Sequence, residues 1–146
     1  VRAIDDILKL EGIDEIHIGL NDLSLGYGKK FMFELLADGT VEKLCLKFKM
    51  AEISYGFGGI ASLGKGMLPA ECILKEHYRL GSTCVILSRS FCDTSKIQDL
   101  DMIRTIFVDG IQKIRELEEE CKIHSDYFTV NQKIVSKIIK KICTEV

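Results

Sequence analysis

The fold is decided by residues Ile13–Gly28, which read IDEIHIGLNDLSLGYG. Apolar residues alternate in IHIGL and stop at a short polar segment with one carboxylate, Asp22, which two glycines, Gly26 and Gly28, follow. Alternation of this kind predicts a half-buried strand. A strand that ends in a carboxylate and a glycine-rich turn is a common way to place a metal ligand or a base at the mouth of a parallel sheet.

The segments around this stretch alternate between extended and helical patterns. Strands are expected at Ile13–Leu20, Glu52–Ile60 and Cys84–Leu87. Helical spacing of apolar residues predicts helices over Arg2–Leu10, Lys29–Leu36, Leu68–Leu80, Ile97–Cys121 and Phe128–Val146. The segment Val41–Met50 (VEKLCLKFKM) fits both patterns, and we favour a strand or an irregular hairpin there. Strands that alternate with helices indicate an α/β fold with right-handed crossovers and a parallel sheet.

The amino-acid composition limits the classes of protein to which the chain can belong. A chain of 146 residues with 47% hydrophobic and 29% charged residues is typical of one globular domain. The net charge of -2 gives no basic field for nucleic acid, and no apolar run approaches the roughly 20 residues of a membrane span. None of the six cysteines sits in a CxxC pair. Small buried thiols in a reducing cytoplasm are therefore expected, with a disulfide framework or a zinc site as the alternatives.

The run GLNDLSLGYG resembles the turn after the sixth strand in the citrate lyase β-subunit and HpcH–HpaI aldolase family. The shared pattern is a strand, a glycine, an Asp–Leu pair and a second glycine, here Gly19, Asp22, Leu23 and Gly26. The later segments SYGFGGIAS, LPAECILKEHYRLG and TCVILSRSF follow the same order as strand seven, its helix and strand eight. The resemblance implies the C-terminal half of a TIM (β/α)8 barrel over residues 1–121, with an extra C-terminal helix over residues 122–146.

The resemblance also implies a metal and a substrate. The matching aspartate in that family binds Mg²⁺ or Mn²⁺, which would make Asp22 a metal ligand. The metal would chelate a small keto-acid, pyruvate or phosphoenolpyruvate-like, and stabilise the enolate formed when a carbon–carbon bond breaks. Gly19 and the backbone amides of Asn21 and Asp22 would hold the substrate carboxylate. The plainer alternatives are that Asp22 caps a helix or turn and that Gly19 serves a simple tight turn.

Two further segments carry candidate anion ligands. In the loop FGGIASLGKG, the glycines Gly58 and Gly59 and the side chain of Lys65 could cradle an anion, or the loop could be mobile and solvated. Arg89, directly after the third predicted strand, is well placed for a carboxylate or phosphate but could equally pair with a helix carboxylate. His17 and His77 are interpreted as ordinary structural or exposed histidines.

The sequence therefore predicts the C-terminal part of a cytoplasmic, metal-dependent carbon–carbon lyase or aldolase. The glutamate ligand and the substrate arginine of the family lie on earlier strands, so this chain alone is expected to be inactive. Two alternatives stay open: a non-catalytic interaction or regulatory module that keeps the barrel scaffold, and another phosphate-binding barrel enzyme. An uncovered apolar face and a free strand edge predict a homo-oligomer.

Overall fold

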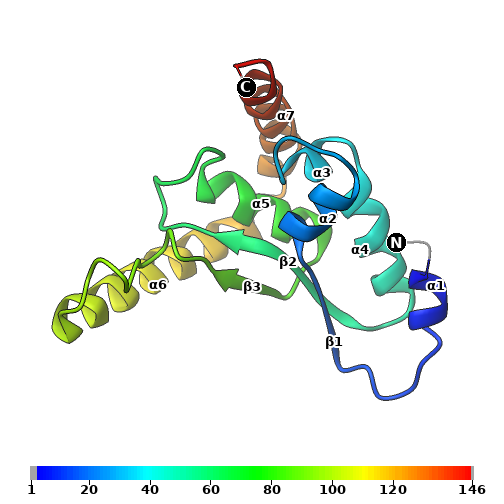
Figure 1. Cartoon of the computed structure of the whole chain (residues 1–146), viewed down its shortest axis with the longest axis horizontal. Coiled ribbons are helices and arrows are strands. Elements are labelled where there is room, and N and C mark those ends of the chain that lie inside the picture. Colours follow the sequence, from blue (N-terminus) through cyan, green and yellow to red (C-terminus); the bar gives the residue numbers. More distant parts are fainter. Residues whose placement is uncertain (1–2, 146) are drawn as a thin grey trace.

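Three parallel strands form the centre of the fold (Figure 1). The computed structural model of the chain describes residues 3–145. The strands are β1 (Glu15–Ile18), β2 (Ser54–Ile60) and β3 (Cys84–Leu87), and they lie in the order β1-β2-β3. Ile16 faces Tyr55 across β1 and β2, and the β2–β3 register shifts between Gly56 and Gly59. The predicted parallel pairing of three adjacent strands is confirmed, although β1 is shorter than expected.

The described part of the chain also contains seven helices. They are α1 (Ile4–Ile7), α2 (Leu20–Gly26), α3 (Glu34–Ala37), α4 (Thr40–Met50), α5 (Ala70–Leu80), α6 (Leu100–Ile123) and α7 (Tyr127–Glu145). The helices predicted near α5, α6 and α7 are confirmed. The helix expected over Lys29–Leu36 is reduced to the short α3, which follows a turn. Within residues 3–145 no helix is both long enough and apolar enough to cross a bilayer.

The prediction of a strand or hairpin at Val41–Met50 is wrong, because this segment lies within helix α4. The buried residues Val41, Leu44, Cys45 and Phe48 recur at spacings of three and four, which is the helical period. Leu46, which completes the apparent alternation with Leu44 and Phe48, is 58% exposed. Met50, the fourth residue of the same alternation, is 77% exposed, so the alternating set is not buried together and the helical face is, and burying that face stabilises the helix.

Helices α4 and α5 pack on the same face of the sheet. The phenol of Tyr55 on β2 donates to the carbonyl of Leu80 on α5 at 2.6 Å, and its ring lies 5.7 Å from the ring of Phe48 on α4. On the opposite face, Glu15 and Ile86 are exposed, Ile86 by 55%. The strands therefore carry a helical layer on one face and present the other to solvent.

Two glycines in β2 are required by close approaches. A Cβ added at Gly56 would lie 2.3 Å from the Sγ of Cys84, so only glycine lets β2 and β3 pair at this register. Gly58 has a φ of 60°, and a Cβ there would meet the Cδ1 of Leu20 at 2.9 Å. The imidazole Nε2 of His17 on β1 lies 2.9 Å from the carbonyl oxygen of Gly58 and donates to it. Together these contacts bring helix α2 down onto the end of β2.

Helix α6 extends away from the rest of the molecule at its N-terminal end (Figure 1). Its N-cap is Asp99, whose carboxylate accepts from the amide of Met102 at 2.8 Å. Only Ile114 and Cys121 on this helix are buried, and both lie in its second half. Leu100 is 79% exposed. The first half of α6 is therefore held by its own cap and by the partly buried residues Ile103, Ile106 and Phe107. The ring of Phe107 lies 5.4 Å from that of Phe91.

A buried ion pair joins the helices behind the sheet. The carboxylate of Glu76 on α5 is 1% exposed and accepts from Nε of Arg79 at 2.8 Å. Its other oxygen accepts from the side-chain amide of Asn131 on α7 at 2.9 Å. Arg79 also donates through Nη1 to Glu42 on α4 at 2.8 Å. The chain of side chains from Glu42 to Asn131 thus ties three helices together.

We predict that Glu76→Ala destabilises the fold by about 3–5 kcal/mol, because it leaves Arg79 and Asn131 without their buried partner. The control is Glu42→Ala, which removes the outer, 49% exposed partner of the same arginine and should cost roughly 0.2–1 kcal/mol. Guanidinium denaturation followed by circular dichroism measures both. Equal losses for the two variants would show that burial of Glu76 does not govern the stability of this network.

Candidate functional site

A pocket of about 530 Å³ lies at the carboxyl ends of β2 and β3. Lys65, from the loop after β2, and Arg89, from the loop after β3, both line it. In adjacent parallel strands the carboxyl ends meet at one edge of the sheet, so the two following loops are neighbours. The other residues that line the pocket are Ser62, Ser90, Phe91, Cys92, Asp93, Lys96 and Ile97.

Serine hydroxyls hold these two loops in place. The side chain of Ser88, at the end of β3, donates to the carbonyl of Ile60 at the end of β2 at 2.9 Å. Ser62 donates across the same gap to the carbonyl of Phe91 at 2.9 Å. The floor of the pocket is the buried ring of Phe91, which is 4% exposed. The pocket is therefore built on fixed backbone, while its charged side chains are at the surface.

The pocket carries more positive than negative charge. Lys96 pairs with Asp93 at 3.3 Å, and the hydroxyl of Ser95 beside that carboxyl holds the pKa of Asp93 below its ordinary value. Lys65 and Arg89 are exposed, and neither has an ion-pair partner among residues 3–145. Two cations therefore remain available for an anion, and the hydroxyl of Ser90 also lines the pocket.

The structure places Asp22 elsewhere. It lies in the first turn of helix α2, is exposed, and lines a hollow of about 460 Å³ beside β1, α1 and α4 with Gly19. Its Oδ2 lies 3.7 Å from the point where a Cβ would stand on Gly19. Asn21 is exposed in the same turn. The predicted carboxylate and the predicted cations therefore do not converge on one pocket.

A divalent cation does not fit these residues alone. In the described part of the chain, no three His, Cys, Asp or Glu side chains are close enough to hold one ion. Mg²⁺ keeps its water shell unless several oxygen ligands are fixed around it, and Asp22 supplies a single carboxylate. The two β2 glycines predicted as ligands, Gly58 and Gly59, shape the strand, and neither lines the pocket of Lys65 and Arg89.

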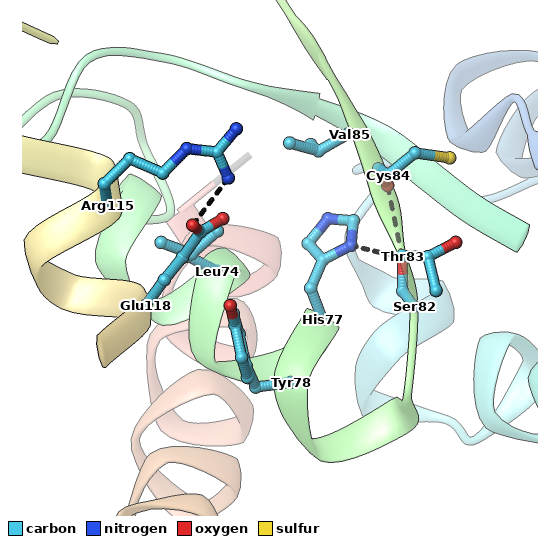
Figure 2. A pocket seen from close by; sticks show the side chains of 9 residues that line it. All are labelled: Leu74, His77, Tyr78, Ser82, Thr83, Cys84, Val85, Arg115 and Glu118. Carbon is cyan, nitrogen blue, oxygen red and sulfur yellow. Dashed lines mark hydrogen bonds and ion pairs between the residues drawn. The ribbon is translucent and has the colours of Figure 1, made fainter. Parts of the chain in front are cut away.

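A second cavity, of about 540 Å³, lies between α5, β3 and α6 (Figure 2). His77 lines it and is 3% exposed, with its ring stacked on Phe57 at 3.8 Å between centroids. Burial, together with the charge of the nearby His17, lowers the pKa of His77 to about 3. The sequence analysis missed this site, because its walls come from segments 30 to 40 residues apart along the chain, such as His77 and Arg115.

The buried histidine makes stability depend on pH. Its pKa is about 3 in the folded chain and 6.5 in the unfolded chain, so below 6.5 the unfolded state alone takes up this proton. The free energy of unfolding should therefore fall as the pH drops from 6.5 toward 3. Between pH 7 and pH 5 the loss from this group is about 2 kcal/mol.

His77→Phe keeps the stacked ring and removes the titration, so the variant should lose about 2 kcal/mol less than the native chain between pH 7 and pH 5. Guanidinium denaturation at the two pH values measures the difference. Carboxylates and the other histidines titrate in both proteins and cancel in the comparison. An identical pH dependence in both proteins would contradict a neutral, buried His77.

The comparisons with known proteins add no family. No family model matches the chain, and neither a curated protein nor a solved structure matches it. What is shown is an α/β fold with a three-stranded parallel sheet and long C-terminal helices. Any assignment of activity therefore rests on the residues and the geometry described above.

Proposed function

We propose that the chain is the C-terminal part of a β/α barrel enzyme, and that it holds a small anionic substrate between Lys65 and Arg89. The observation that carries the proposal is the convergence of two cations, neither of which has an ion-pair partner within the described residues, on loops that follow neighbouring parallel strands. A carboxylate or a phosphate group meets both cations there, and the guanidinium can bind two oxygens at once. A keto-acid or a phosphoenolpyruvate-like compound has the required charge.

The order of the strands supports the barrel part of this proposal. Each strand is the neighbour of the one before it, with the connecting helices α4 and α5 on one face. A (β/α)8 barrel has this arrangement, with helices outside and the other face of the sheet turned inward. His17, Gly56 and Cys84 lie in one row across that other face, as the register shows. In a complete barrel this row would point to the interior.

The proposed chemistry is the cleavage of a carbon–carbon bond, as in a lyase or aldolase. It comes from the resemblance of GLNDLSLGYG to the citrate lyase β-subunit and HpcH–HpaI aldolase family. The described residues supply one of the required metal ligands, Asp22, and that residue lies outside the pocket of the two cations. What this chain contributes is therefore the binding and orientation of the anion. Further ligands from outside the described residues would be needed to complete a metal-dependent site.

The proposal includes a reducing, cytoplasmic location and no nucleic-acid partner. All six cysteines are free in the structure, and burial raises the pKa of Cys45 to about 12. Thiols that stay protonated and unpaired are typical of proteins kept in a reducing compartment. The net charge of -2 offers no attraction to a polyanion.

Arg89→Ala and Lys65→Ala should each weaken the binding of phosphoenolpyruvate by about tenfold or more, because each removes one charge-assisted hydrogen bond. Isothermal titration or amide chemical shifts measure the affinity for phosphoenolpyruvate, pyruvate and inorganic phosphate. Arg104→Ala is the matched control, since Arg104 is an exposed arginine on α6 that does not line this pocket.

Substitution of the predicted metal ligand, Asp22, is a second part of the same experiment. Asp22→Asn should leave metal-free binding of phosphoenolpyruvate unchanged, because Asp22 lines the other hollow. Equal affinity in the Arg89 and Arg104 variants would remove the pocket from the proposal. A loss of metal-free binding in Asp22→Asn would show that the anion binds beside α2 and not between the two loops.

We also propose that copies of the chain associate through the uncovered sheet face. Ile86 on this face is 55% exposed, and β3 pairs on one side only. The apolar face of α7 is largely used within the chain, because Val135 and Ile139 are buried against the core. An exposed strand edge beside an apolar side chain favours pairing with another chain.

Ile86→Lys should weaken self-association by about tenfold, because it places a charge in the proposed contact. Sedimentation velocity over a range of protein concentrations measures this. Met50→Lys is the control, since Met50 is an equally apolar residue, 77% exposed, at the far end of α4. A monomer at all concentrations, or equal association of the two variants, would overturn this part of the proposal.

A further inference from the structure

The cavity between α5, β3 and α6 has the size of a ligand site. Its volume of about 540 Å³ lies within the roughly 300–1,000 Å³ of small-molecule pockets. A single water occupies only about 30 Å³. Figure 2 shows the residues that line it: Leu74, His77, Tyr78, Ser82, Thr83, Cys84, Val85, Arg115 and Glu118. None of them lines the pocket of Lys65 and Arg89.

A buried polar atom in the wall of this cavity lacks a partner. His77 Nδ1 lies 2.7 Å from the hydroxyl oxygen of Ser82. That hydroxyl lies 3.2 Å from the carbonyl oxygens of both Tyr55 and Cys84 and donates its proton to one of them. It therefore accepts from His77, which puts the ring proton on Nδ1 and leaves a lone pair on Nε2. Nε2 is buried and has no hydrogen-bond partner among residues 3–145.

The orientation of the ring directs this lone pair into the cavity. The imidazole stacks on Phe57 at an interplanar angle of 5°, and Ser82 holds its other nitrogen, so the ring cannot rotate freely. In Figure 2 the nitrogen without a partner lies on the side of the ring away from Ser82, toward Val85 and the α6 residues. A buried acceptor without a partner costs free energy, which a ligand that donates a hydrogen bond would recover.

The charges of the ionisable side chains in the cavity wall cancel. Arg115 donates to Glu118 at 2.6 Å, so the pair brings no net charge. His77 is neutral, since its pKa is far below its ordinary value. Tyr78 and Thr83 add hydroxyl groups, and Leu74 and Val85 add apolar surface. An anion would meet the Nε2 lone pair and the Glu118 carboxylate, while a cation would meet Arg115, so a neutral molecule fits best.

We propose that this cavity binds a small neutral polyol, one hydroxyl of which donates to Nε2 of His77. A second hydroxyl donates to the carboxylate of Glu118, which is 16% exposed and so is held at the edge of the cavity. The carbon skeleton packs on Leu74 and Val85, as polyols and sugars do through their C–H faces. The requirement for a donor follows from the tautomer, because a neutral ring protonated on Nδ1 can only accept at Nε2.

The probes are glycerol, erythritol and glucose, with 1,2-dimethoxyethane as the matched ether that keeps oxygen acceptors but has no donor. Nitrogen NMR of the ¹⁵N-histidine-labelled chain reads the bond directly, because the unprotonated Nε2 resonance moves upfield when the nitrogen accepts a hydrogen bond. At least one polyol should shift the His77 Nε2 resonance in a saturable way, and the ether should not. This arm needs no variant and so does not depend on a variant's folding.

Two substitutions test the assignment of the residues. His77→Phe and Glu118→Gln should each weaken the binding of that polyol by about tenfold, as expected for one lost hydrogen bond. His124→Phe is the control, because His124 is exposed and stacks on Tyr127 outside the cavity. The proposal is overturned if no polyol shifts the Nε2 resonance, if the ether binds as well, or if His77→Phe binds the polyol as tightly as the native chain.

Discussion

The carboxylate of Glu76 sets the constraint on which the helical layer depends. A charge that is 1% exposed must be matched by donors placed around it, and here they come from Arg79 on its own helix and from Asn131 on α7. Glu42 then holds the far side of the arginine. Apolar contacts alone would allow the three helices to slide against one another, whereas directional hydrogen bonds to one carboxylate fix their relative positions.

The position of the helices in turn fixes the sheet. Tyr55 on β2 reaches α5 through its hydroxyl and α4 through its ring, and Phe57 two residues later stacks on His77. Tyr55 and Phe57, which alternate along β2, thus face the helices. The glycines that alternate with them, Gly56 and Gly58, lie against β3 and α2. Gly56 and Gly58 occur where Cys84 and Leu20 come closest, so the absence of a side chain determines the spacing on this side.

Much of the topology could be predicted from the sequence, because parallel strands and amphipathic helices have separate periods. The segment Val41–Met50 was misjudged because Leu44, Leu46, Phe48 and Met50 alternate, while Val41, which extends the helical face, lies only at its start. Lys65 and Arg89 could be predicted to meet, because loops after adjacent parallel strands share an edge. Asp22 could not be placed by the same rule, since α2 begins directly after β1 and carries it toward α4. The His77 cavity depends on how α6 crosses α5, which no local pattern encodes.

The span of the Glu76 network along the chain has a consequence for synthesis. The pair Glu76–Arg79 lies within one helix and can form as soon as α5 does, but Asn131 is 55 residues further on. Until α7 has emerged from the ribosome, it cannot cover the Glu76 carboxylate, and this face of α5 remains exposed to water. The core behind the sheet therefore closes only when α7 arrives, and a nascent chain that stops short of α7 exposes the apolar face of α5 to the cell.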